Sequence, residues 1–275
     1  MSTATNSVRL WPEGSANDAD SQFGRPRLDV FAPAGHGPGD GRAAMIVCPG
    51  GGYAGLAPHE GAPFAELFAA AGMVGMVCFY RVAPNRWPAG YADLARAVRL
   101  VRANAEAWGI DPQRVGVMGF SAGGHNAATV ATQPAVHVDG DDDLADAFDA
   151  RPDRLALGYP VISIGAYGHR GSGESLFGPE VTQEQRQAVS ADLHVSEATP
   201  PTFIFHTVDD PAVPIEGSMR FALACRRANV PVELHAYERG PHGVGLARDE
   251  PRLAGWSDLL LHWLAAAGWA ERGAG

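Results

Sequence analysis

Short apolar runs alternate with longer segments of helical periodicity along most of the chain. Runs that predict strands lie at residues 45–48, 74–80, 115–120, 155–161, 202–208 and 232–237. Segments with apolar residues at helical spacing lie at residues 63–71, 91–108, 123–131, 216–228 and 252–266. This alternation indicates parallel strands joined by crossover helices. The sequence therefore predicts an α/β fold with a doubly wound, mostly parallel sheet, whose ligands bind at the carboxyl ends of the strands.

The length of the chain fits one elaborated domain. Its 275 residues, of which 46% are hydrophobic and 19% charged, suffice for one large core. We therefore expect residues 1–275 to form a single domain. Within it, residues 165–197 are rich in Gly, Ser, Gln and charged side chains and carry no strong strand signal. This stretch predicts an insertion of loops and helices that forms a partial lid over the site.

The charge of the chain opposes one broad class of partner. A formal net charge of −10 disfavours contact with phosphate backbones, which proteins bind through Lys and Arg, so we expect no nucleic-acid partner. Residues 1–11 lack the basic and apolar regions of a signal peptide, and no later apolar run is long enough to span a bilayer. We expect a cytoplasmic protein without a membrane partner, and a homo-oligomer stays possible.

The segment Gly119-Phe120-Ser121-Ala122-Gly123 has the form G-x-S-x-G. In a hydrolase such a serine occupies a strained turn between a strand and a helix, where side chains at the flanking glycines would collide with neighbouring backbone. The pattern alone is common by chance. Here it follows a predicted strand and precedes a predicted helix, as that role requires, and Ser121 is therefore the candidate nucleophile.

A serine hydroxyl needs a base within hydrogen-bond reach, and a carboxylate must orient that base. Asp209 and Asp210 follow the run 202–208, and His242 lies in the Gly/Pro-rich loop after the run 232–237. The order Ser, Asp, His is the order of the α/β-hydrolase type. A loop after the last strand lets an imidazole reach the serine, which favours His242 over the three histidines on predicted strands or a helix, His125, His206 and His235.

Backbone N–H groups are the expected donors to the oxyanion of an acyl-transfer reaction. The residue after the nucleophile, Ala122, supplies one. The glycines that follow the run 45–48 let the backbone approach a substrate carbonyl, and Gly51 and Gly52 are the predicted further donors.

Two cofactor patterns are incomplete. Glycines 50, 52 and 55 match a dinucleotide fingerprint, but no acidic residue follows the next strand to hold a ribose. Asp139, Asp141 and Asp143 begin like a calcium loop, but Leu144 and Ala150 stand where Gly and Glu are required. The three cysteines, Cys48, Cys78 and Cys225, suggest buried thiols rather than a disulfide or zinc site. We therefore expect no metal and no cofactor.

A series of motifs in order extends from about residue 49 to residue 246. The motifs are Pro49-Gly50-Gly51-Gly52-Tyr53, His59-Glu60-Gly61, Tyr80-Arg81-Val82-Ala83-Pro84, Gly119-Phe120-Ser121-Ala122-Gly123-Gly124-His125, Tyr159-Pro160-Val161-Ile162, Pro200-Pro201-Thr202-Phe203, His206-Thr207-Val208-Asp209-Asp210 and Gly240-Pro241-His242-Gly243. With them the chain resembles α/β-hydrolase esterases of the acetyl-xylan and carbohydrate-esterase type and, more distantly, the hormone-sensitive-lipase-like carboxylesterases. Pro49 stands where the lipase-like relatives have His, which favours the carbohydrate-esterase branch.

The resemblance implies a role for each site residue. It makes Ser121 the nucleophile, His242 the base, Asp209 the residue that orients His242, and Gly51, Gly52 and Ala122 the oxyanion donors. For the acid, alignment on His206-Thr207 selects Asp209, whereas counting D-x-x-V back from Val213 selects Asp210. We favour Asp209, because the acid usually leaves the strand at the first loop position.

The expected function is that of a serine esterase that hydrolyses short-acyl esters, acetyl esters above all, of carbohydrates. Two alternatives stay open, a serine peptidase of the prolyl-oligopeptidase type and a non-catalytic relative that binds a carbohydrate or a partner. Five further side chains could line a pocket for the alcohol part of the substrate, or could be structural, namely Tyr53, His59, Glu60, His169 and Ser172.

Overall fold

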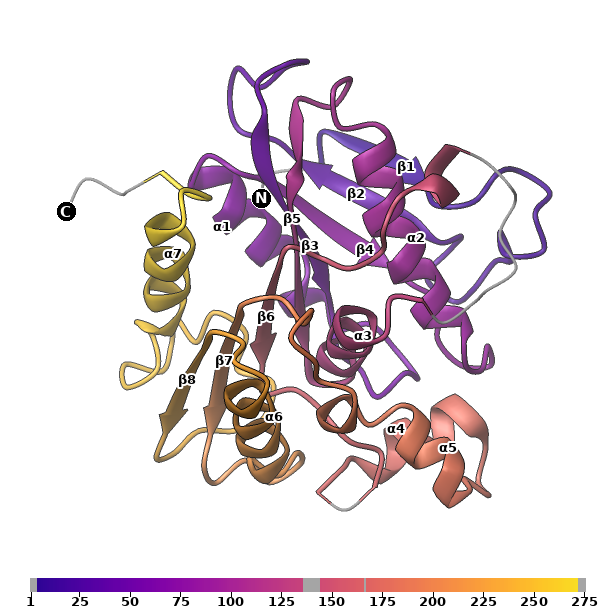
Figure 1. Ribbon diagram of the computed structural model, residues 1–275, viewed down its shortest axis with the longest axis vertical. Helices are drawn as coiled ribbons and strands as arrows, with labels where there is room; N and C mark the ends of the chain where they lie inside the picture. Colours follow the sequence, from indigo (N-terminus) through magenta and orange to yellow (C-terminus); the bar gives the residue numbers. More distant parts are fainter. Residues whose placement is uncertain (1–3, 136–143, 166, 272–275) are drawn as a thin grey trace.

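An eight-stranded sheet forms the centre of the computed structural model, which describes residues 4–135, 144–165 and 167–271. The strand order is β1-β2-β4-β3-β5-β6-β7-β8 (Figure 1). The strands are β1 (Asn6–Arg9), β2 (Arg27–Phe31), β3 (Arg42–Cys48), β4 (Val74–Phe79), β5 (Ile110–Phe120), β6 (Arg154–Gly158), β7 (Thr202–Thr207) and β8 (Val232–Tyr237). Strands β3 to β8 are parallel, and β1 and β2 add an antiparallel edge. The predicted mostly parallel α/β sheet is confirmed.

Helices cover both faces of the sheet (Figure 1). One face carries α1 (Ala62–Ala70) and α7 (Trp256–Ala266), and the other carries α2 (Ala89–Ala103), α3 (Ser121–Thr132) and α6 (Glu216–Arg227). Strand β3 shows how the two cores arise. Ala44, Ile46 and Cys48 pack on the face covered by α2, α3 and α6. The alternate residues Met45 and Val47 pack on the face covered by α1 and α7. Successive strand side chains point to opposite faces, so both faces of a central strand must be apolar.

Two strands at the edge of the sheet were not expected from the sequence. Three of the four residues of β1 are exposed, and β2 carries the charged residues Arg27 and Asp29. Neither strand therefore shows the apolar run of a strand buried on both faces. Strand β6 is shorter than expected, because Tyr159 takes a left-handed φ of 36° directly after Gly158.

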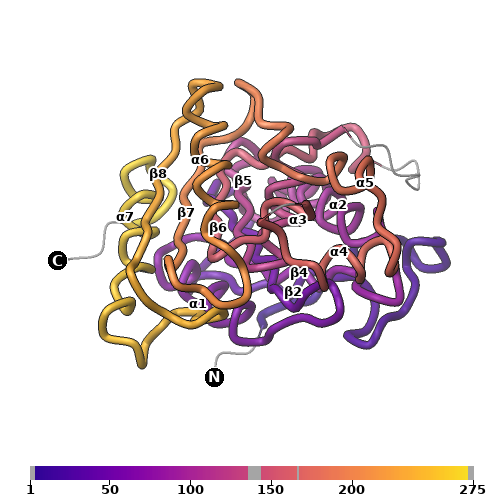
Figure 2. The backbone as a smooth tube through the Cα atoms, turned by 90° about the horizontal axis from the view of Figure 1, so that it is seen from below, coloured from indigo at the N-terminus to yellow at the C-terminus, as the bar shows by residue number. Residues whose placement is uncertain are grey.

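The insertion expected at residues 165–197 contains the helices α4 (Arg170–Phe177) and α5 (Gln183–Ala188) and the 3₁₀ turn η3 (Ala191–Leu193). A capping box between Thr182 and Gln185 begins α5. Figure 2, which looks at the end where the parallel strands finish, shows α4 and α5 beside α3 at that end. The insertion therefore lies at the end of the sheet where ligands are expected. The acidic run that resembles a calcium loop, with Asp139, Asp141 and Asp143, lies outside the described residues.

Two further 3₁₀ turns are η1 (Pro58–Glu60) and η2 (Leu144–Ala147).

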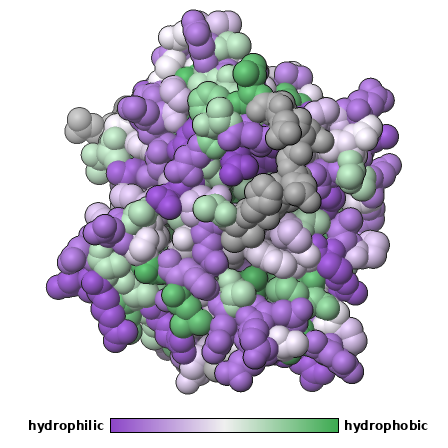
Figure 3. Space-filling model, turned by 45° about the vertical axis from the view of Figure 1, so that its right-hand side comes forward, coloured by the Kyte–Doolittle hydropathy of each residue, from purple (hydrophilic) through white to green (hydrophobic). Residues whose placement is uncertain are grey.

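Polar side chains cover much of the face in Figure 3, and apolar side chains form small groups between them. No helix in the described parts of the chain is both long and apolar enough to cross a membrane.

Candidate active site

Ser121 stands at the junction of β5 and α3, with a left-handed φ of 49°. The flanking glycines permit this turn. A Cβ at Gly119 would lie 2.3 Å from the carbonyl oxygen of Gly123, and a Cβ at Gly123 would lie 2.2 Å from the carbonyl oxygen of Cys48. These distances are far below van der Waals contact. The G-x-S-x-G pattern therefore has the steric origin that the sequence suggested.

His242 reaches Ser121 from the loop after β8. Its Nε2 lies 2.9 Å from Ser121 Oγ, and its Nδ1 lies 2.7 Å from Oδ2 of Asp210. The side chain of Asp210 is fully buried. The ring of Tyr159 meets the imidazole edge-on, with 5.1 Å between the ring centroids. Side chains from three distant loops thus form one hydrogen-bonded series.

The expectation that Asp209 orients His242 is wrong. Asp209 is exposed, and its Oδ1 accepts a hydrogen bond of 2.8 Å from the N–H of Gly240. Strand β7 ends at Thr207, and the turn that follows directs Asp209 toward solvent and Asp210 inward. The N–H groups of Ala212 and Val213 then hold Oδ1 of Asp210 at 2.8 and 2.9 Å. The alternative selected by the D-x-x-V spacing is the correct one.

The surroundings of Asp210 keep its carboxyl group ionised. Burial alone would raise its pKa, but hydrogen bonds from His206, His242 and two backbone N–H groups outweigh burial and hold the pKa well below its usual range. A carboxylate only accepts, so Nδ1 of His242 must carry the proton. Nε2 is then the acceptor for the Ser121 hydroxyl proton, which is the arrangement a general base needs.

The glycine loop after β3 packs directly against Ser121. A Cβ at Gly50 would lie 2.8 Å from Ser121 Cβ. The carbonyl of Gly50 accepts from Ala57 N–H, and that of Gly51 accepts from the N–H groups of Ala54 and Gly55. Among the described residues, no group accepts from the N–H of Gly51 or Gly52. Both glycines have left-handed φ values, 132° and 64°.

The N–H of Ala122 lies in the first turn of α3, where backbone donors have no partner within the helix. The three predicted oxyanion donors, Gly51, Gly52 and Ala122, are thus on segments that flank Ser121, and their role in catalysis stays a prediction.

The side chains considered for an alcohol pocket have separate positions. Tyr53 and Ser172 are buried, and neither lines an open surface. The Tyr53 hydroxyl donates to Nδ1 of His125 at 2.7 Å, and Nε2–H of His125 donates to the Val189 carbonyl at 2.7 Å. Burial lowers the pKa of His125 to about 4, although the bond to Val189 acts in the opposite direction. His125 is therefore a neutral structural group.

His169 lies beside the glycine loop. Its Cε1 would be 3.7 Å from a Cβ placed on Gly52. Its Nδ1 caps α4 by accepting from the N–H of Ser172, so the proton of a neutral ring is on Nε2. Burial and then the proximity of His242 lower the pKa of His169. A neutral imidazole with a free N–H thus lies next to the site.

His59 and Glu60 follow the same glycine loop and differ in exposure. His59 is exposed, and its Nε2 lies 2.9 Å from the carbonyl oxygen of Gly243. Glu60 is only 2% exposed and contacts the backbone of Gly50 and the hydroxyl of Tyr159.

Two residues that touch this site had no assigned role in the sequence. Tyr159 contacts the imidazole of His242. Nε2 of His206 lies 3.4 Å from Oδ2 of Asp210 and also faces the carbonyl oxygen of Val213. The only sequence signal was their membership of the ordered motifs. Tyr159 is far from His242 in the chain, so local spacing could not predict their contact.

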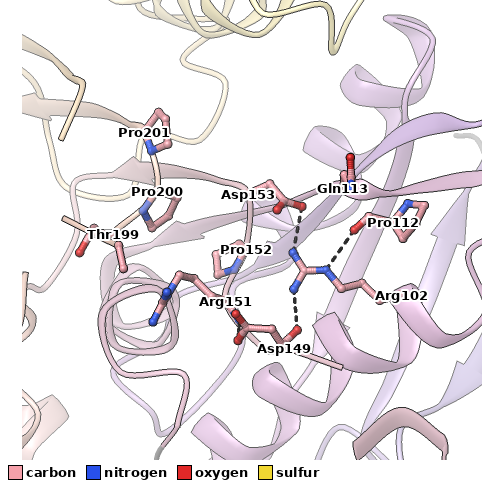
Figure 4. A pocket seen from close by; sticks show the side chains of 11 residues that line it. Arg102, Pro112, Gln113, Asp149, Arg151, Pro152, Asp153, Thr199, Pro200 and Pro201 are labelled. Carbon is pink, nitrogen blue, oxygen red and sulfur yellow. Dashed lines mark hydrogen bonds and ion pairs between the residues drawn. The ribbon is translucent and has the colours of Figure 1, made fainter. Parts of the chain in front are cut away.

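A hollow lies at the opposite end of the parallel strands, near the amino ends of β6 and β7 (Figure 4). Arg102 there donates to the carbonyls of Pro112 and Asp149 and to the carboxylate of Asp153. This arginine is satisfied by its neighbours. In an α/β sheet ligands bind at the carboxyl ends of the strands, so this hollow is separate from the candidate site.

The described residues contain no group of three or more His, Cys, Asp or Glu side chains that could hold a metal ion. The three cysteines are free and buried.

The chain is similar to one protein family and to several known proteins. Residues 28–224 match the family model BD-FAE. The chain is 36% identical over 254 residues to the Endo-1,4-beta-xylanase B of Butyrivibrio fibrisolvens, which covers 90% of this chain and 39% of that protein. It is 31% identical over 231 residues to the Acetylxylan esterase of Xylanibacter ruminicola, which covers 82% of this chain and 45% of that protein. The chain thus spans less than half the length of these curated relatives.

A solved structure shows the same arrangement over nearly the whole chain. The acetyl ester-xyloside bifunctional hydrolase from Caldicellulosiruptor lactoaceticus superposes with a TM-score of 0.89 at 36% identity, over 96% of this chain and 97% of that one. The resemblance to α/β-hydrolase esterases is confirmed. The chain therefore belongs to the BD-FAE family and has the α/β-hydrolase fold.

Proposed function

We propose that this protein is a serine esterase that removes short acyl groups, acetyl above all, from carbohydrate alcohols. The observation that carries the proposal is the hydrogen-bonded series from Ser121 through His242 to Asp210. A binding module has no need of a serine held in a left-handed turn with a base and a buried carboxylate behind it.

The geometry supports a two-step acyl transfer. His242 Nε2 takes the Ser121 proton as Oγ attacks the ester carbonyl carbon, and the carbonyl oxygen becomes an oxyanion. The N–H groups of Gly51, Gly52 and Ala122 stabilise that oxyanion. The C–O bond to the alcohol then breaks, and the alcohol leaves with the proton from His242.

The second half of the reaction releases the acid. The acyl group is now an ester of Ser121, and water attacks it with His242 again accepting the proton. A second tetrahedral oxyanion forms and collapses, and Oγ recovers its proton as the carboxylic acid departs. Asp210 holds the tautomer of His242 through both steps and stabilises the imidazolium.

The substrate class is supported by the relatives. One is named an acetylxylan esterase, and the structure with the same arrangement is that of an acetyl ester-xyloside hydrolase. The N–H of His169 beside the glycine loop is a donor suited to the oxygen atoms of a sugar alcohol. Together they favour acetylated sugars over lipid esters.

A substrate panel tests the proposal. Initial rates are measured on acetylated xylo-oligosaccharides, on p-nitrophenyl esters from acetate to decanoate, and on peptide amides, each with Ser121→Ala as control. We expect the highest kcat/KM on acetyl esters and loss of activity in the control. Equal rates for both proteins, or activity confined to amides, would contradict the proposal.

A further inference from the structure

Glu60 is a buried carboxylate with both oxygens engaged. Its side chain is 3% exposed. Oε2 accepts a hydrogen bond of 2.7 Å from the N–H of Gly50, and Oε1 accepts one of 2.8 Å from the hydroxyl of Tyr159. Removing a carboxylate from water is costly unless hydrogen bonds compensate for it, so this residue has a specific task that an apolar side chain would not perform.

The contacts of Glu60 connect two loops of the candidate site. Gly50 begins the glycine loop that packs against Ser121. Tyr159 extends the connection to the other side, because its hydroxyl oxygen accepts a hydrogen bond of 3.1 Å from the N–H of Gly245, just after His242. The ring of Tyr159 also packs edge-on against the His242 imidazole. One carboxylate therefore links the loop of the oxyanion donors to the loop of the base.

The bond to Gly50 also determines which donors the glycine loop offers. Glu60 occupies the N–H of Gly50, and the carbonyls of Gly50 and Gly51 are bound within the loop. These bonds fix the peptide planes on either side. The N–H groups of Gly51 and Gly52 are left for a ligand. A Cβ on Gly50 would lie 2.8 Å from both Oε2 of Glu60 and Cβ of Ser121, so little space separates carboxylate, loop and nucleophile.

The hydroxyl of Tyr159 stays protonated in this setting. Burial and then the nearby Glu60 carboxylate raise the pKa of Tyr159 well above its usual value. Its O–H therefore donates to Glu60 while its oxygen accepts from Gly245. The direction of each hydrogen bond in the series is thus fixed by chemistry.

We propose that Glu60 is a positioning residue for catalysis, which holds the oxyanion donors of the glycine loop and, through Tyr159, the loop of His242 in one geometry around Ser121. The inference rests on the proposed esterase function. Glu60 itself does not touch the reacting atoms. Its effect should appear in the transition state more than in substrate binding.

The test uses two substitutions that keep side-chain shape. Glu60→Gln replaces one acceptor oxygen by an amide nitrogen, so it cannot accept from both Gly50 and Tyr159. Tyr159→Phe keeps the ring against His242 and removes the hydroxyl. On p-nitrophenyl acetate we expect kcat to fall about 10- to 100-fold for Glu60→Gln, less than the loss from deleting an oxyanion donor outright, with KM almost unchanged. Tyr159→Phe should also lower kcat, and the double variant should lose less than the product of the two effects.

Controls separate positioning from general stability. Glu66→Gln makes the same chemical change in α1 and should keep wild-type kcat. Thermal melts give the Tm of each variant, and kinetics are measured at a temperature below the Tm at which the variant is folded. If Glu60→Gln does not fold, Tyr159→Phe carries the test alone.

Lower melting temperatures with unchanged kcat in both variants would show a purely structural role and overturn the inference. Wild-type protein without activity on any ester would instead overturn the proposed function and this inference with it. An active wild type with unaffected variants overturns the inference alone, so the two failures are distinguishable.

Discussion

Nδ1 of His242 lies 2.7 Å from Asp210, whereas the neighbouring Asp209 is exposed and binds the backbone of Gly240. The two aspartates are adjacent and chemically identical, and the turn after β7 alone assigns them different tasks. Only the one that faces inward can fix the tautomer of the base.

A matched pair of substitutions tests this assignment. Asp210→Asn should lower kcat by roughly 10⁴-fold, because an amide no longer enforces the tautomer in which Nε2 of His242 accepts the proton. Asp209→Asn should leave kcat close to wild type, since an amide oxygen can still accept from Gly240. Steady-state kinetics on p-nitrophenyl acetate measure both. A large loss in Asp209→Asn together with an active Asp210→Asn would contradict the assignment.

His169 should discriminate between substrates. Replacing it by Asn keeps a good N-cap for α4 but withdraws the N–H from the glycine loop. We expect KM for an acetylated xylo-oligosaccharide to rise about fivefold, the factor that corresponds to the free energy of one net hydrogen bond. KM for p-nitrophenyl acetate should stay unchanged. Parallel kinetics on the two substrates check this. An equal rise for both substrates would show that the residue does not contact the alcohol.

The stability of the protein should decline in mild acid because of His125. Its pKa is about 4 in the folded state and 6.5 when unfolded, so the unfolded state binds more protons below pH 6.5. At neutral pH this group does not change the free energy of unfolding. As the pH falls from 6.5 to about 4, it lowers the free energy of unfolding by roughly 3 kcal/mol in all. The lowered pKa of His169 acts in the same direction.

The matching variant is His125→Gln, whose amide can accept from Tyr53 and donate to Val189 without titrating. Chemical denaturation between pH 4 and 7 should give it a shallower decline than the wild type. Parallel declines would show that His125 is not the group responsible.

How much the sequence could predict depends on the range of each interaction. Strands β3 to β7 were predicted because burial on both faces demands continuous apolar runs, whereas β8, at the other edge of the sheet, has no buried residue. Strand β1 was missed because an edge strand keeps polar side chains, and β2 was missed because its charged residues Arg27 and Asp29 interrupt the apolar run. Ser121 and His242 were found through local motifs and loop position. Asp209 was chosen wrongly because it is the first loop position, whereas the turn after β7 directs the next residue, Asp210, inward, as the D-x-x-V spacing indicated.

The role of Glu60 could not be inferred from the sequence. Its partner Tyr159 is 99 positions away, and they meet only because β6 ends beside η1 in the folded sheet. Sequence patterns report spacing within an element, whereas contacts of this kind depend on how the elements pack.

Covalent labelling by an organophosphate identifies the nucleophile, which we expect to be Ser121. The protein is incubated with the organophosphate paraoxon while hydrolysis of p-nitrophenyl acetate is followed, and the modified residue is identified by peptide mass spectrometry. We expect one diethylphosphoryl group per chain, on Ser121, with activity lost in proportion to labelling and no label in Ser121→Ala. Loss of activity with Ser121 unmodified, or full activity with Ser121 fully labelled, would show that Ser121 is not the nucleophile.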